Sequence, residues 1–151
     1  MSSLTFNYDV FISYQWGIKK EVEEFHKRLE ANGNIKAWRD PNLRSNDESI
    51  YSQLAKQIKQ SRLFLCFLTK AYCKSDMCRN EIVFAKKLGK TIIYLMIEKM
   101  NNDELSDEVN FIMGNSVYFQ CYKNPKSWWI DDFDSIRKSI ESNLEVSFFI
   151  F

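Results

Sequence analysis

The chain has few of the residues that build flexible linkers, metal sites or charged binding surfaces. Its 151 residues include only four glycines and two prolines, so we expect no linker, repeat or low-complexity segment. One histidine and four cysteines without a CxxC spacing argue against a zinc site and predict reduced thiols in a cytoplasmic protein. No run approaches the ~18–20 apolar residues of a membrane span, and the N-terminus lacks the basic and apolar regions of a signal peptide.

The chain also lacks an excess of charge of either sign. Lysine and arginine total 21 against 20 acidic residues, a net charge of +1. Because nucleic acids and anionic membranes favour a basic excess, we expect neither as the main partner. Hydrophobic residues make up 45% and charged residues 27%, which is typical of a globular chain, and the length predicts a single domain over residues 1–151.

Short apolar runs alternate with segments of helical period. The runs predict strands at residues 8–14, 35–38, 63–69, 91–97 and 117–119. Helical spacing of apolar residues predicts helices at about 22–29, 50–58, 75–88, 107–113 and 128–140. This order predicts an α/β fold, a three-layer doubly wound (flavodoxin-like) sandwich whose central parallel sheet of about five strands is flanked by helices.

In folds of this class, ligands bind beyond the carboxyl ends of the strands. Three segments meet there in the predicted topology: the loop after Tyr14, the loop after Trp38 and the loop that leads into Glu81. We therefore expect the functional site, if the domain has one, in the crevice between these segments.

Glu81 stands out because of its place on the predicted helix 75–88. It shares one face of that helix with Cys78, Ala85 and Leu88, which look inward. A carboxylate at the edge of a buried face is costly unless it is paired, hydrogen-bonded or used. Two interpretations stay open at this point: a glutamate that reaches solvent or caps a neighbouring loop, and a functional carboxylate.

Four segments, in a definite order and spacing, carry a family resemblance. They are the run YDVFISY at 8–14, Trp38-Arg39-Asp40 with Leu43 and Ile50 behind it, Ser61 through Leu68-Thr69 to Ser75-x-x-Cys78-x-x-Glu81, and Phe133 to Ile140 after Trp128-Trp129. Together they resemble the Toll/interleukin-1 receptor (TIR) domain family. The resemblance covers about residues 8–144 and leaves an apolar tail at 145–151.

The resemblance implies two functions of different classes. Some TIR domains hydrolyse or cyclise NAD+ and release nicotinamide, with a glutamate at the position of Glu81 as the catalytic residue. Others are interaction modules that assemble with further TIR domains and do no chemistry. The glutamate occurs in both kinds, so both remain open; the enzymatic one takes NAD+ as a substrate and implies neither a cofactor nor a metal.

Other residues around the expected crevice have two interpretations each. Tyr14, Gln15 and Trp16 follow the first strand, where an aromatic ring could stack on nicotinamide or adenine; alternatively, Trp16 covers the edge of the core. Asp40 and Arg44 could contact ribose or phosphate, or be solvated loop charges.

Departures from the family pattern bear on the same choice. Met77 occupies a position where a tryptophan is common in the family, which reduces the surface available for stacking. Gln15-Trp16 replaces basic residues found in enzymatic members, and Cys78 is interpreted as a small buried residue. The loop after Trp38, which ends in Leu43, is closer to the form found in enzymatic branches.

We therefore expect a cytoplasmic TIR domain that self-associates and hydrolyses or cyclises NAD+, with Glu81 as the catalytic residue. Tyr14, Trp16, Trp38 and Asp40 are weaker candidates for lining the site. The alternative is a non-catalytic scaffold that makes its contacts through residues 39–47 and the third helix. A phosphoacceptor receiver domain shares the fold class but is disfavoured, because Asp9 lies inside the first strand instead of at its end.

Overall fold

A single parallel sheet organises the chain. The computed structural model describes residues 5–32, 34–40 and 48–149. The strand order is β2-β1-β3-β4-β5, and every neighbouring pair is parallel. The strands are β1 (Tyr8–Ser13), β2 (Ala37–Arg39), β3 (Ser61–Leu68), β4 (Thr91–Met96) and β5 (Tyr118–Phe119). The predicted doubly wound α/β sandwich with a five-stranded parallel sheet is confirmed.

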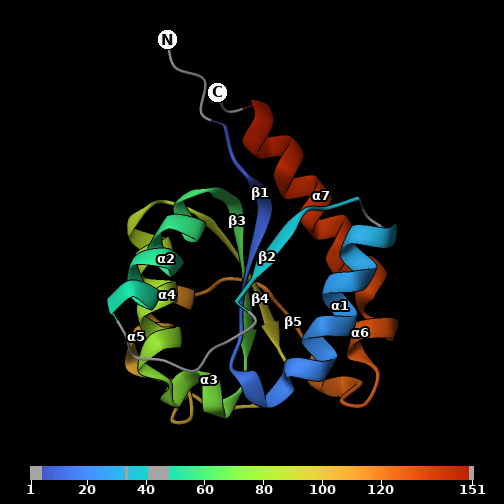
Figure 1. Cartoon of the computed structure of the whole chain (residues 1–151). Helices are drawn as coiled ribbons and strands as arrows, with labels where there is room; N and C mark the ends of the chain where they lie inside the picture. The colour runs from blue at the N-terminus through green and yellow to red at the C-terminus, as the bar shows by residue number, and fades with distance from the viewer. Residues whose placement is uncertain (1–4, 33, 41–47, 150–151) are drawn as a thin grey trace.

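Helices cover both faces of the sheet and make it the middle of three layers (Figure 1). One face carries α1 (Lys19–Asn32), α6 (Trp128–Asp131) and α7 (Phe133–Phe149). The opposite face carries α2 (Glu48–Lys59), α3 (Lys70–Lys74), α4 (Asp76–Lys87) and α5 (Asp107–Met113). Two short 3-10 turns, η1 (Trp16–Ile18) and η2 (Cys121–Lys123), follow β1 and β5.

The two faces have separate hydrophobic cores because side chains alternate along each strand. Val10 and Ile12 of β1 point to the α1 side, whereas Phe11 between them points to the α2–α5 side. Strand β3 is apolar and buried along almost its whole length, as expected for a central parallel strand with helices on both faces.

Residues at both ends of α4 account for the bounds of the helix that carries Glu81. Ser75 is its N-cap, and the Ser75 hydroxyl accepts a hydrogen bond from the Cys78 backbone N–H at 3.2 Å. The helix ends at Lys87, and Gly89 follows with a φ of +72°, a conformation that glycine adopts without a steric cost. The position of α4 therefore follows from its own end residues.

Four expectations about the helices and strands differ from the structure. The second strand begins at Ala37, two residues later than expected, and α3 was missed because a helix of five residues has too few positions to show a period. The last helix is divided at Asp132 into α6 and α7. Because α7 continues to Phe149, the expected tail from residue 145 is helical as far as that residue.

Within the described ranges, no helix combines the length and the apolar character needed to cross a bilayer.

Candidate functional site

Glu81 is a buried carboxylate on the second turn of α4. Only 7% of its surface is exposed, and α4 packs directly against β1, β4, α2, α3 and α5. The Ser13 hydroxyl, at the carboxyl end of β1, donates a hydrogen bond to Glu81 Oε1 at 2.6 Å. Glu81 therefore does not reach solvent from its helix, and the surface interpretation is excluded.

The environment of Glu81 favours its neutral form. Burial raises the pKa of the Glu81 carboxyl to about 8, because an ionised carboxylate loses its hydration there. The Ser13 hydrogen bond acts in the opposite direction and lowers that pKa, whereas the nearby negative charge of Asp40 raises it. A carboxyl group with its pKa this close to neutrality can change charge in the working pH range of an enzyme.

A cavity of about 220 Å³ lies against Glu81, between α2 and α4. Its lining is mostly apolar and consists of Tyr51, Leu54, Ala55, Ile58, Met77, Asn80, Glu81 and Phe84. Glu81 is the only carboxylate among these residues. An apolar cavity with one buried acid can hold a flat ring and place a developing positive charge beside the carboxylate.

Tyr14 and Asp40 are both buried, in contrast to the predicted roles. Tyr14 is 2% exposed and packs in the core on the α1 side, because it continues the alternation of Val10 and Ile12. Its hydroxyl donates a hydrogen bond to the Asp40 backbone carbonyl at 3.0 Å. Asp40 is therefore not a solvated loop charge, and the ring of Tyr14 is not available to stack on a ligand.

Trp16 and Gln15 lie at the start of η1, beyond the carboxyl end of β1. Trp16 is 64% exposed, so it does not cover the edge of the core, and its ring is available to a ligand or a partner. Gln15 caps the 3-10 turn, since its side-chain oxygen accepts a hydrogen bond from the Gly17 N–H at 2.7 Å. The stacking role predicted for this segment therefore remains possible for Trp16 alone.

Trp38, Met77 and Cys78 all belong to the α2–α5 side of the sheet. Trp38 is partly buried and stacks on Phe11 with ring centroids 5.2 Å apart. Met77 lines the cavity at Glu81. Cys78 is buried, its thiol donates a weak hydrogen bond to the Tyr14 carbonyl at 3.7 Å, and burial raises its pKa far above the range of a reactive thiolate. Arg44 lies outside the described residues.

The sequence analysis missed Ser13 and Tyr72 as partners of Glu81. Ser13 Oγ lies 2.7 Å from the Tyr72 hydroxyl as well as 2.6 Å from the carboxylate. A serine in a strand buried on both faces needs a hydrogen-bond partner, and this was the signal available for Ser13. No such signal existed for Tyr72, because it lies on the unpredicted helix α3.

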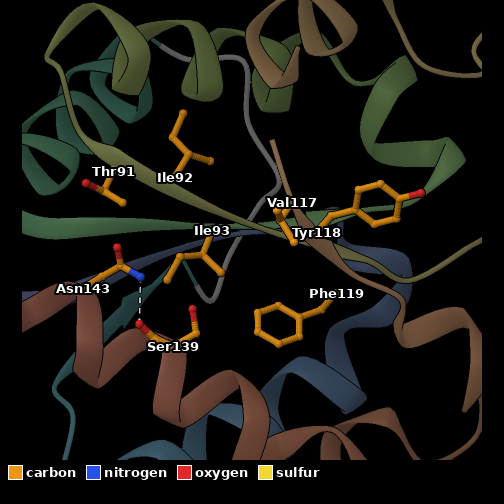
Figure 2. Close-up of a pocket in the computed structure, with 8 residues that line it drawn as sticks. All are labelled: Thr91, Ile92, Ile93, Val117, Tyr118, Phe119, Ser139 and Asn143. Carbon is orange, nitrogen blue, oxygen red and sulfur yellow. Dashed lines mark hydrogen bonds between the residues drawn. The ribbon is translucent and has the colours of Figure 1, made fainter. Parts of the chain in front are cut away.

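A second cavity, of about 210 Å³, lies where β4 and the edge strand β5 face α7 (Figure 2). Residues of β4, the β5 segment and α7 line it: Thr91, Ile92, Ile93, Val117, Tyr118, Phe119, Ser139 and Asn143. The Asn143 side-chain amide donates a hydrogen bond to the Ser139 carbonyl at 2.8 Å. None of its lining residues is an acid, a histidine, a lysine or a cysteine, so the polar side-chain groups of this cavity are hydroxyl and amide groups.

Among the described residues, no three histidine, cysteine, aspartate or glutamate side chains form a group that could hold a metal ion. The chemistry available at the first cavity is that of one buried carboxyl group and the hydroxyl groups around it.

The fold and the site define a flavodoxin-like α/β domain with a buried carboxylate near the carboxyl edge of its sheet. The TIR domain family model matches residues 10–142, and the chain belongs to the TIR domain family.

Solved structures of similar fold include TIR and SEFIR domains. The TIR domain of the Toll-related receptor TRR-2 from Hydra magnipapillata is 18% identical, with a TM-score of 0.61 over 87% of this chain and 99% of that one. A prokaryotic SEFIR domain is 18% identical, with a TM-score of 0.60 over 91% and 98%. The TIR domains of the activated Roq1 resistosome are 21% identical, with a TM-score of 0.53 over 95% and 85%. No curated protein matches the chain.

Proposed function

We propose that this TIR domain self-associates and hydrolyses or cyclises NAD+, releasing nicotinamide, with Glu81 as the catalytic carboxylate. The observation that carries the proposal is the placement of Glu81, a buried acid held by Ser13 at the wall of an apolar cavity. The family resemblance adds the substrate, since NAD+-cleaving TIR domains have their catalytic glutamate at the matching position.

The chemistry requires little besides such a carboxylate. Nicotinamide in NAD+ is a cationic leaving group, so its bond to ribose can break without a general acid. The transition state resembles an oxocarbenium ion, which a nearby carboxylate stabilises. Water then completes hydrolysis, or a nucleophile within the substrate completes cyclisation.

The cavity volume supports a role for assembly. At about 220 Å³ the cavity is smaller than a typical ligand pocket of about 300–1,000 Å³. It can therefore hold a ring-sized part of NAD+, while the rest of the dinucleotide lies outside, against exposed groups such as Trp16 or against a neighbouring copy. The similarity to TIR domains of an activated resistosome supports self-association of this kind.

A second candidate function is a non-catalytic TIR–TIR scaffold, which the neutral state of Glu81 favours. A carboxyl group with a pKa of about 8 that is hydrogen-bonded to Ser13 is stable as a structural element without any turnover. Met77, in place of a larger aromatic ring at the cavity, agrees with this alternative.

The test is nicotinamide release from NAD+ by the concentrated, assembled protein, measured by chromatography for the native chain and Glu81→Gln. We expect Glu81→Gln to lower turnover by at least about 100-fold, since removal of a transition-state charge partner typically has an effect of this size. Circular dichroism and light scattering should show unchanged folding and oligomer size.

Glu24→Gln is the matched control, because Glu24 is an exposed glutamate of α1 whose salt-bridge partner is Lys27. It should retain native turnover. Absence of turnover in native protein that is demonstrably assembled would refute the enzymatic proposal and leave the scaffold.

A further inference from the structure

Three side chains from three elements form a continuous buried hydrogen-bonded chain that ends on Glu81. Tyr72 of α3 lies 2.7 Å from Ser13 Oγ at the end of β1, and Ser13 Oγ lies 2.6 Å from Glu81 Oε1. Tyr72 and Ser13 are 0% and 1% exposed, so water does not compete for these hydrogen bonds.

The number of hydroxyl protons determines which group donates each of these hydrogen bonds. A serine hydroxyl has one proton, and when the Glu81 carboxyl is ionised Ser13 donates this proton to it. In that state the Ser13 hydroxyl oxygen accepts a hydrogen bond from the Tyr72 hydroxyl. Tyr72 thereby polarises Ser13 and strengthens its hydrogen bond to the carboxylate.

The other titratable groups around Tyr72, Ser13 and Glu81 do not supply a positive charge to the Glu81 carboxyl. Cys66 of β3 neighbours Tyr72, Cys78 lies one turn before Glu81 on α4, and Tyr51 of α2 lines the adjoining cavity. Asp40, after β2, acts on Glu81 as a negative charge. Among the described residues, the hydrogen bond from Ser13 is therefore the interaction that favours the ionised Glu81 carboxylate.

We propose that Ser13 and Tyr72 are positioning residues for Glu81: the Ser13 hydroxyl, itself held by the Tyr72 hydroxyl, binds one carboxyl oxygen and favours the ionised form of the carboxyl group. This inference rests on the proposed NAD+ cleavage, in which the carboxylate faces a developing cation. The burial of Glu81 opposes ionisation, and the Tyr72–Ser13 pair offsets part of that opposition.

The first experiment observes the carboxyl group itself, without any need for turnover. The 13C resonance of the Glu81 side-chain carboxyl, assigned by its absence in Glu81→Gln, is followed against pH in the native chain, Ser13→Ala and Tyr72→Phe. We expect the titration midpoint to rise by about one pH unit in Ser13→Ala and by a smaller amount in Tyr72→Phe.

Matched controls separate this role from simple loss of a buried hydroxyl. Ser61→Ala removes a buried serine hydroxyl of β3 that donates to Gln57 in α2, and Tyr94→Phe removes a buried tyrosine hydroxyl of β4. Neither of these two described residues forms a hydrogen bond with Glu81, so both midpoints should stay at the native value. Ser13→Thr retains the hydroxyl and should restore the native midpoint.

The second experiment follows the pH dependence of kcat for nicotinamide release in the same variants. The acidic limb of the profile should move to higher pH in parallel with the carboxyl midpoint. A carboxyl midpoint that is unchanged in both Ser13→Ala and Tyr72→Phe would overturn the inference, as would a shifted midpoint with an unmoved rate profile. A shifted midpoint in a chain with no turnover would support the positioning of Glu81 while refuting the proposed NAD+ cleavage.

Discussion

Two cavities among the described residues are nearly equal in volume and unequal in chemistry. The cavity between α2 and α4 measures about 220 Å³ and contains the buried carboxyl of Glu81. The cavity at β4, β5 and α7 measures about 210 Å³ and is lined by hydroxyl, amide and apolar groups (Figure 2). Size therefore does not distinguish them.

The cavities differ in the polar groups that line them. At the first cavity, a carboxyl group is buried, and desolvation raises its pKa. The Ser13 hydroxyl donates a hydrogen bond to this carboxyl and is itself hydrogen-bonded to Tyr72. At the second, the Asn143 side-chain amide donates a hydrogen bond to the Ser139 backbone carbonyl within α7. A buried acid that is only partly compensated indicates function more strongly than a hollow of the same size.

The largest expected effect that separates the cavities is on the pH dependence of stability. The folded-state pKa of Glu81, about 8, lies above its ordinary value, so its stabilising contribution is complete below about pH 4.5 and is lost as pH rises through 8. The loss is on the order of 5 kcal/mol in the free energy of unfolding. Urea unfolding at pH 5, 7 and 9 should therefore show a shallower decline for Glu81→Gln than for the native chain.

Glu24→Gln, at an exposed site, serves as the reference in these titrations and should follow the native curve. A Glu81→Gln curve parallel to the native one between pH 5 and 9 would mean that Glu81 is not desolvated, and the contrast between the cavities would disappear.

A smaller effect is expected from filling each cavity in turn. Ala55→Leu adds side-chain volume to the first cavity and Ser139→Leu adds it to the second. We expect kcat/KM for NAD+ to fall about tenfold in Ala55→Leu, because the ring-sized space beside Glu81 is lost, and to change less than about twofold in Ser139→Leu. Steady-state kinetics at matched oligomer concentration measure both, and equal losses would show that the first cavity has no special role.

The smallest effect belongs to the second cavity. Asn143→Ala removes the hydrogen bond from the Asn143 amide to the Ser139 carbonyl and should lower the free energy of unfolding by about 0.5–1 kcal/mol. Turnover should not change. A larger loss of stability or any loss of turnover, seen by urea unfolding and nicotinamide release, would show that this cavity contributes more than local packing.

The parts of the structure that were predictable from sequence depend on local spacing and end residues. The parallel sheet, the cap at Ser75 and the inward face of Glu81 follow from periodicity and from residue types next to each other in the chain. Glu81 could thus be selected as a candidate without knowledge of its neighbours.

The parts that were not predictable depend on contacts between distant segments. Ser13 and Glu81 are 68 positions apart, and Ser13 and Tyr72 are 59 positions apart, so no local pattern links them. Tyr14 and Trp16 differ for a related reason: Tyr14 continues the inward alternation of β1, whereas Trp16 follows the end of the strand and is exposed. A shift of two residues at a strand end reverses the environment of an aromatic ring.

The short outer strands of the sheet constrain how copies of this domain can join. The outermost strands, β2 and β5, consist of three and two residues, so each presents few backbone groups for pairing with another chain. Short edges of this kind discourage the addition of strands from a second molecule. The self-association proposed above should therefore use helical and loop surfaces and leave the sheets of the two copies separate.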